Sequence, residues 1–130
     1  MRTRRRAAIG LMISAMATGA TMVWAQGTPI PRPTPGLMPN PGLGKALYEK
    51  SCAQCHGSDL RGSTQGPPLV HRIYEPSHHA DIAFQLAVKY GTRQHHWSFG
   101  DMKPVEGVSP DDVAHITAYV RFKQREAGIR

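Results

Sequence analysis

Apolar side chains recur three and four residues apart in three segments of the chain, which is the spacing of a helix that buries one face. The first segment runs from Leu43 to Ala53. Within it Leu43, Leu47 and Tyr48 share one side, and no helix breaker follows Gly44. The pattern therefore predicts a first helix over residues 43–53.

The second segment covers about residues 80–90. Its apolar positions at helical spacing are Ile82, Leu86 and either Phe84 or Val88. Gly91 follows directly and suits the left-handed backbone that often ends a helix. We expect a second helix here that serves mainly to pack the fold.

The third segment has the clearest start signal. Ser109 is suited to the N-cap, Pro110 to the first helical position, and two aspartates then complement the helix dipole. An apolar stripe follows at Val113, Ile116, Tyr119 and Val120, and Gly128 marks the end. No segment alternates with period two, so the sequence predicts an all-α domain.

The first 25 residues resemble an export signal. A basic start over residues 1–6 precedes an uncharged run over residues 7–24, and Ala25 suits cleavage by signal peptidase. We expect export to the periplasm with cleavage after Ala25, and hence no stable membrane insertion. The alternative is an uncleaved signal that anchors the protein to the membrane, because the uncharged run is close to the length of a bilayer span.

Residues 26–42 are rich in proline, with six of the 11 prolines of the chain. This composition predicts an extended linker, which either holds the domain away from a membrane or partner or forms a disordered leader to the fold. The domain itself is then expected over residues 43–130.

The charge balance argues against a nucleic-acid partner. Of the 16 basic residues, four arginines lie in the expected signal, which leaves 12 basic against nine acidic residues and a net charge of +3. These charges are spread along the chain without a basic run or interleaved aromatics. We therefore expect no nucleic-acid binding, whereas docking to an acidic protein surface stays open.

A domain of this size needs help to fill its interior. Aromatic residues make up only 7% of the chain, and glycine and proline together number 24. Small domains commonly recruit disulfides, a metal or a large cofactor. The two cysteines lie too close in sequence to join distant segments, so we expect a cofactor.

The strongest chemical signal is Cys52-Ala53-Gln54-Cys55-His56, which contains both cysteines of the chain. Two thiols about one helical turn apart can add across the two vinyl groups of a haem, while the following histidine binds the iron. The motif predicts one covalently attached haem c.

Two other chemistries use similar motifs. A thioredoxin-like dithiol belongs to a strand-to-helix turn in a mixed fold, and no strand is predicted here. A zinc site would need a fourth ligand such as His95, and the adjacent Cys55 and His56 have awkward geometry for one tetrahedral ion.

The chain resembles class I cytochromes c. Gly44, Tyr48, Cys52, Cys55 and His56 match the opening Gly-x-x-x-aromatic-x-x-x-Cys-x-x-Cys-His of that family. The run Gly66-Pro67-Pro68-Leu69 resembles its Gly-Pro-x-Leu loop, and residues 116–121 resemble its C-terminal helix. The resemblance covers about residues 43–127 and implies a cytochrome c fold, with three or more helices wrapped around the haem.

The resemblance also implies contacts. The first and last helices of the family cross, so Gly44 and Tyr48 should meet Ile116 and Tyr119. The proline loop supplies a backbone carbonyl to the haem-ligating histidine, so Pro67 should accept a hydrogen bond from the second ring nitrogen of His56.

The resemblance further implies that Met102 is the sixth iron ligand. Four of the six methionines lie in the expected signal, and Met38 lies in the linker. Many family members have proline directly after this methionine, whereas Lys103 intervenes here. Met102 as ordinary packing, or His95 or His96 as the axial ligand, are alternatives.

Histidine is frequent outside the haem motif, at His71, His78, His79, His95, His96 and His115. The two adjacent pairs suggest a second metal site, although neighbouring loop histidines more often bond to solvent or backbone. Arg93, Trp97 and the 95–96 pair are also candidates to contact haem propionates.

These observations predict an electron carrier rather than an enzyme, because an iron with both axial positions filled does not readily bind substrate. The expected partners are redox proteins: a dehydrogenase or respiratory complex as donor, and an oxidase or reductase as acceptor. The alternative is a haem enzyme or ligand-binding haem protein with an open or labile sixth position. No paired carboxylates indicate acid–base catalysis.

Overall fold

The computed structural model describes residues 29–130, so the expected signal over residues 1–25 lies outside it. The elements in chain order are α1 (Pro41–Ser51), α2 (Ala53–His56), the 3-10 helix η1 (Arg72–Tyr74), α3 (Asp81–Tyr90) and α4 (Pro110–Glu126). Within residues 29–130 there is no strand, only an isolated antiparallel bridge between Thr92 and Met102. The prediction of an all-α domain is confirmed.

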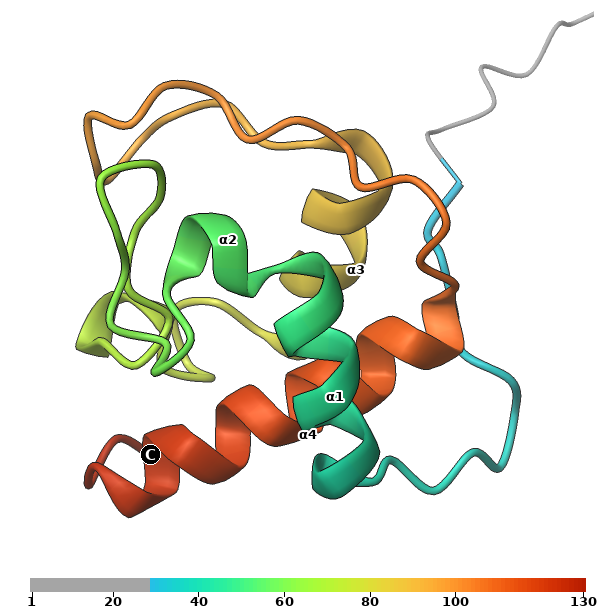
Figure 1. Ribbon diagram of the computed structural model, residues 1–130. Helices are drawn as coiled ribbons and strands as arrows, with labels where there is room; N and C mark the ends of the chain where they lie inside the picture. Colours follow the sequence, from blue (N-terminus) through green and yellow to red (C-terminus); the bar gives the residue numbers. More distant parts are fainter. Residues whose placement is uncertain (1–28) are drawn as a thin grey trace, which may run out of the picture.

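Helices α1 and α4 cross (Figure 1). Gly44 of α1 lies directly against the backbone of α4. A Cβ on Gly44 would lie 1.9 Å from the His115 carbonyl oxygen and 3.0 Å from the Cβ of Tyr119. Real side chains cannot approach that closely, so only glycine permits this crossing. The expected meeting of the first and last helices is present.

The main core cluster forms where these helices meet. Tyr48 and Val120 are fully buried, and the rings of Tyr48 and Tyr119 lie 5.7 Å apart at a tilt of 56°. Ile116 and Leu60 complete the centre of the cluster. Aromatic rings at this separation attract each other beyond their burial, which fixes α1 against α4.

The start of α4 is set by a capping box. The Ser109 hydroxyl accepts from the backbone N–H of Asp112, whose carboxylate accepts from the backbone N–H of Ser109 at 3.0 Å. Pro110 occupies the first helical position, where a missing N–H costs nothing. The helix ends before Gly128, whose φ is +76°. The predicted cap and end are both confirmed.

Buried Arg121 joins α4 to the segment before α3. Its guanidinium donates to the Tyr74 carbonyl oxygen at 2.5 Å, to the His79 carbonyl oxygen, and to the exposed Asp81 carboxylate at 2.8 Å. It also lies over the Phe84 ring, 5.1 Å from the ring centre. One side chain therefore holds the end of η1 and the start of α3 against α4.

The proline-rich segment packs on the domain over its described part, residues 29–40. The backbone N–H of Thr34 donates to Asp111 at 2.6 Å, the backbone N–H of Asn40 donates to His115 Nδ1 at 2.9 Å, and the Tyr90 hydroxyl donates to the Pro29 carbonyl oxygen at 2.6 Å. The first two bonds hold the segment against the N-terminal part of α4, and the third holds Pro29 at the end of α3. The linker expected from composition thus lies against the fold here.

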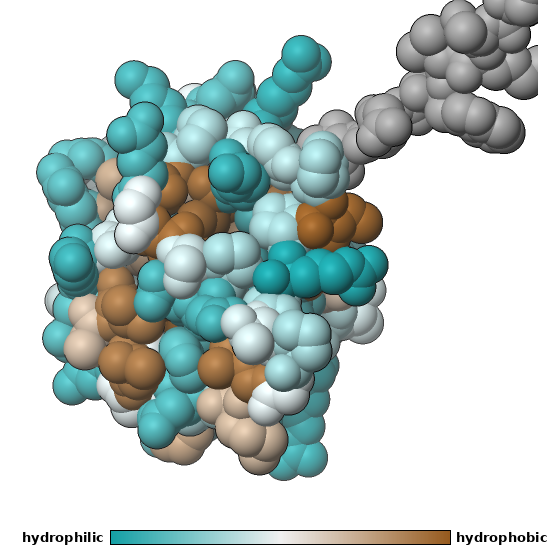
Figure 2. All heavy atoms as spheres, turned by 90° about the vertical axis from the view of Figure 1, so that its right-hand side faces the viewer, coloured by the Kyte–Doolittle hydropathy of each residue, from teal (hydrophilic) through white to brown (hydrophobic). Residues whose placement is uncertain are grey.

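The surface in Figure 2 is largely hydrophilic, with hydrophobic residues gathered in separate patches. Large exposed apolar side chains within residues 29–130 include Ile30, Ile82, Phe99 and Phe122. Among the described residues, every helix falls short of the length and apolar character required of a membrane span.

Candidate functional site

A cavity of about 800 Å³ lies between α2, α3 and the loop that follows α3. This volume falls within the range of about 300–1,000 Å³ typical of small-molecule and cofactor sites. Its walls are mostly apolar and include Leu69, Phe84, Val113 and Ile116. Cys52, Cys55, His56 and Met102 also line it, so the structure brings together the residues that the sequence singled out for chemistry.

The two cysteines stand at a break between helices. Cys52 ends α1 with φ −127° and begins α2, a single turn that carries Cys55 and His56. Cys52 is half-buried and Cys55 is exposed, and no disulfide joins them. Burial and the neighbouring Cys55 raise the pKa of Cys52 to about 11, so it is a neutral thiol at pH 7.

The end of α2 is held by backbone contacts. The Tyr48 hydroxyl donates to the Gly57 carbonyl oxygen at 2.6 Å. Gly57 has φ +80°, and a Cβ there would lie 2.6 Å from the Gly62 carbonyl oxygen. These contacts tie His56, the residue before Gly57, to the core.

The His56 ring is oriented by the proline loop. Its Nδ1 lies 2.8 Å from the Pro67 carbonyl oxygen, so Nδ1 carries the proton and Nε2 keeps a free lone pair. Burial lowers the pKa of His56, against the raising effect of this bond, so the ring is neutral and able to bind a metal. Gly66 permits the approach, since a Cβ there would lie 2.9 Å from the Cys55 carbonyl oxygen.

Met102 closes the base of the loop after α3. Its backbone exchanges two hydrogen bonds with Thr92, of 3.0 and 2.9 Å. A Cβ on Gly91, which has φ +74°, would lie 2.4 Å from the Met102 carbonyl oxygen. The half-buried Met102 is thereby placed at the C-terminal end of α3, along the cavity wall.

The loop between Thr92 and Met102 carries Trp97. The buried indole N–H of Trp97 has no aligned acceptor among residues 29–130. Burial raises the pKa of Tyr74, and the nearby Trp97 side chain partly offsets this rise. A buried donor without a partner is costly. Because Trp97 also lines the cavity, its N–H is available to an acceptor on a bound molecule.

The remaining histidines divide into two kinds. His71 caps η1, and His115 accepts the bond from the Asn40 backbone. His78, His79, His95 and His96 instead form one cluster at the cavity edge. Burial lowers the pKa of His79, and its neighbours His78, His95 and Arg121 lower it further against the effect of the Ile73 carbonyl.

Comparison with known proteins decides the family. The family model for cytochrome c matches residues 42–122. The chain belongs to the cytochrome c family. Searches of curated proteins and of solved structures gave no significant match. The cytochrome c domain is all-α and binds haem c, and the protein is an electron-transfer protein that works with redox partners.

The cavity of this cytochrome c suits a haem. Its lining is mostly apolar and includes two thiols, the His56 imidazole with an unshared Nε2 lone pair, and a buried Trp97 indole N–H without an aligned acceptor among the described residues. The sequence suggested a second metal site at the two histidine pairs, but it did not predict that the pairs converge, because they lie 16 residues or more apart in the chain. The doubled histidines were the only signal.

Proposed function

We propose that the chain carries single electrons on one haem c attached through thioethers to Cys52 and Cys55, with His56 and Met102 as the axial iron ligands. The observation that carries this is the 2.8 Å bond between His56 Nδ1 and the Pro67 carbonyl, which leaves Nε2 for the iron in a cavity that Met102 also lines. When bound, the haem supplies a one-electron couple at its iron.

Pro67 acts on the iron through His56. A carbonyl that accepts the Nδ1 proton fixes the ring tautomer and orientation, and it makes Nε2 a stronger donor. The position of Pro67 depends on the tight contact of Gly66 with the Cys55 backbone, which belongs to the attachment turn itself. Attachment and ligation therefore share one rigid unit.

Ligation of the iron by Met102 would favour an electron carrier over a haem enzyme. A thioether is a soft ligand that favours ferrous iron, and two filled axial positions limit both reorganisation and substrate binding. Met38 is no competitor, because it is 84% exposed in the proline-rich segment and does not line the cavity. His95 and His96 line the cavity as well, but their rings face the histidine cluster.

The proposed setting is the periplasm, reached by the N-terminal signal and its cleavage after Ala25. The partners we propose are a dehydrogenase or respiratory complex as donor and an oxidase or reductase as acceptor. Such exchange needs only a partly exposed cofactor edge and a weak docking surface. Mixing the reduced protein with fractionated periplasm and measuring its oxidation would identify the partner.

Two measurements test the proposal. Mass spectrometry of the exported protein should show one added haem, and loss of either Cys52 or Cys55 should remove one thioether. The sulfur-to-iron charge-transfer band of the ferric protein should disappear in Met102→Ala and persist in the control Met38→Ala.

The enzyme alternative gives a different result. High-spin ferric iron in the native protein would exclude His/Met ligation and favour an open or labile sixth position, whereas a charge-transfer band that survives in Met102→Ala would exclude Met102 as the ligand. A low-spin native protein that lacks the band, and that becomes high-spin in His95→Ala or His96→Ala, would also contradict the assignment.

A further inference from the structure

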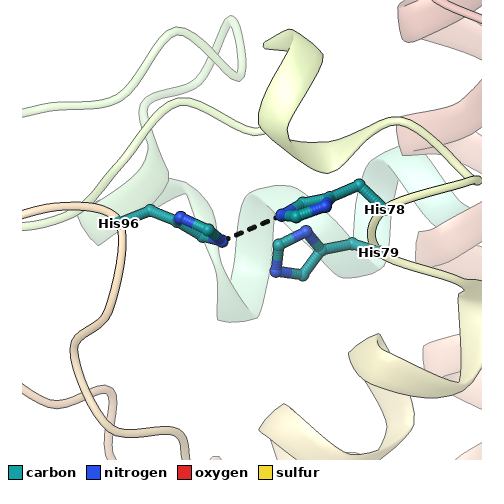
Figure 3. A group of neighbouring side chains, drawn as sticks. All are labelled: His78, His79 and His96. Carbon is teal, nitrogen blue, oxygen red and sulfur yellow. Dashed lines mark hydrogen bonds between the residues drawn. The ribbon is translucent and has the colours of Figure 1, made fainter.

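Three histidines from two separate segments converge (Figure 3), and two of them, His79 and His96, line the cavity. His78 and His79 precede α3, whereas His96 lies in the loop after it. The ligand nitrogens of the three rings all lie within 4.8 Å of one another, and His78 Nε2 and His96 Nε2 are 3.1 Å apart. His95 adjoins the group, with its Nε2 3.4 Å from His79 Nε2.

These separations match the spacing of ligands around one ion. Zinc binds imidazole nitrogen at about 2.0–2.1 Å, which places neighbouring nitrogens of a tetrahedron about 3.3 Å apart. The His78–His96 pair is already at that spacing. The widest separation allowed within the trio, 4.8 Å, closes with small side-chain rotations of two exposed rings.

A hydrogen bond fixes the orientation of the His79 ring. His79 Nδ1 lies 2.6 Å from the Ile73 carbonyl oxygen, so it carries the proton and leaves the Nε2 lone pair pointing to the cluster. Histidines that bind metals in proteins are usually held in this way, through the ring nitrogen that does not bind the ion. His95 is held similarly, with its Nδ1 2.7 Å from the Arg93 carbonyl oxygen.

The backbone on one side of the cluster is fixed before any ion binds. Arg121, itself buried, donates to the His79 carbonyl oxygen and anchors residue 79 to α4. The other side is the loop closed by the Thr92–Met102 bridge. The cluster therefore lies between an anchored segment and the loop whose base is Met102.

We propose that His78, His79 and His96 bind one divalent ion of the zinc class, with the fourth position open to water. Three neutral imidazoles and one water form a common zinc coordination set, and imidazole also suits Cu²⁺ and Ni²⁺. The ion is separate from the haem iron. It links the segment before α3 to the loop over residues 92–102 and so braces that loop.

The competing explanation is that the rings only hydrogen-bond to one another. In that case each close pair shares one proton, with an N–H of one ring donating to the lone pair of the other. Such pairs need no ion and give no saturable metal binding. Metal binding and its dependence on these side chains therefore separate the two explanations.

The test uses the haem-loaded exported protein, treated with a chelator and dialysed, then titrated with ZnCl₂ by calorimetry. We expect one saturable equivalent. The double variant His78→Asn/His96→Asn should bind at least about tenfold more weakly. His71→Asn is the matched control, because asparagine also accepts the capping bond at that position and His71 lies outside the cluster. The Zn²⁺ affinity of His71→Asn should stay within about threefold of that of the parent.

Absence of saturable binding, or equal affinity in the parent and the double variant, would overturn the proposal. Circular dichroism and the haem spectrum report whether each variant is folded, and the single variant His96→Asn, in an exposed loop, replaces the double variant if that fails to fold. A second readout is hydrogen exchange. Zn²⁺ should slow exchange of amides in residues 92–102 of the parent, and unchanged exchange at saturating Zn²⁺ would also overturn the proposal.

Discussion

The carbonyl oxygen of His115 lies so close to the α carbon of Gly44 that an added Cβ would come within 1.9 Å of it. The contact is with backbone on α4, which cannot rotate away as a side chain can. The Tyr119 Cβ, at 3.0 Å, blocks the same space. Gly44 therefore sets the separation of α1 and α4.

We expect Gly44→Ala to destabilise the protein by about 3 kcal/mol, the upper end of the usual cost of overpacking. The measurement is denaturant unfolding of the haem-loaded protein. Lys45→Ala, at the neighbouring exposed position, should change the free energy of unfolding by less than about 0.5 kcal/mol, since its ion pair with Glu49 is exposed. Similar stability in the two variants would show that the crossing is adaptable.

Arg121 gives a second stability prediction. Replacing it with leucine leaves the His79 carbonyl oxygen and the buried Gln124 Oε1 without this donor, whereas the Tyr74 carbonyl oxygen keeps a bond from Gln124 Nε2. We expect a loss of about 3 kcal/mol in the free energy of unfolding, because each unpaired buried group costs about 1–3 kcal/mol. Thermal unfolding of Arg121→Leu tests this.

The control for Arg121 is its charged partner. The Asp81 side chain is 72% exposed, so its ion pair with Arg121 is screened by solvent. Asp81→Asn should cost no more than about 1 kcal/mol. If Asp81→Asn were as destabilising as Arg121→Leu, the charge pair rather than the other hydrogen bonds of Arg121 would be its main contribution to stability.

The capping box of α4 gives a prediction with a pH dependence. Hydrogen bonds from the Ser109 side chain and backbone hold the pKa of Asp112 below its ordinary value. A lowered folded pKa means that the ionised form stabilises the protein at pH above the unfolded pKa, and that this contribution is lost as the pH falls through the folded pKa. Asp112→Asn should therefore be less stable than the parent at pH 7, with the difference shrinking below about pH 4.

Denaturant unfolding of the parent and Asp112→Asn across pH 3–7 measures this effect. Ser109→Ala should cost about 1 kcal/mol at pH 7, as loss of an N-cap usually does. A difference between the parent and Asp112→Asn that stays constant down to pH 3 would mean that the carboxylate charge contributes nothing to the cap.

The helices were predictable where their start signals are local. Ser109 and Pro110 are adjacent in sequence to the apolar stripe they introduce, and α4 begins where that pattern predicts. The start of α1 was placed two residues late. Asn40 caps it and Pro41 fills its first position, but both lie in a proline-rich run that resembles a linker by composition.

The site was predictable only in part, because only some of its residues are brought together by local structure. Cys52, Cys55 and His56 need one helical turn, which spacing alone reveals, whereas the histidine cluster depends on how the loop over residues 92–102 folds back. That fold is set by the Thr92–Met102 bridge, by side-chain hydrogen bonds of Gln94 and Asp101 within the loop, and by contacts at Gly91, none of which periodicity signals. The break of α1 at Cys52 was likewise not visible in the pattern.

The last prediction concerns Gly91 and the proposed ligand Met102. Gly91 and Gly100 both have positive φ, of 74° and 85°, so alanine strains the backbone at either position. They differ in their surroundings, because a Cβ at Gly91 would lie 2.4 Å from the Met102 carbonyl oxygen, whereas a Cβ at Gly100 meets nothing within 4 Å. Gly91→Ala should displace Met102 and weaken the sulfur-to-iron charge-transfer band of the ferric protein, whereas Gly100→Ala should lose about 1 kcal/mol of stability and keep the band. Equal bands in the two variants, both folded, would show that the end of α3 does not position Met102.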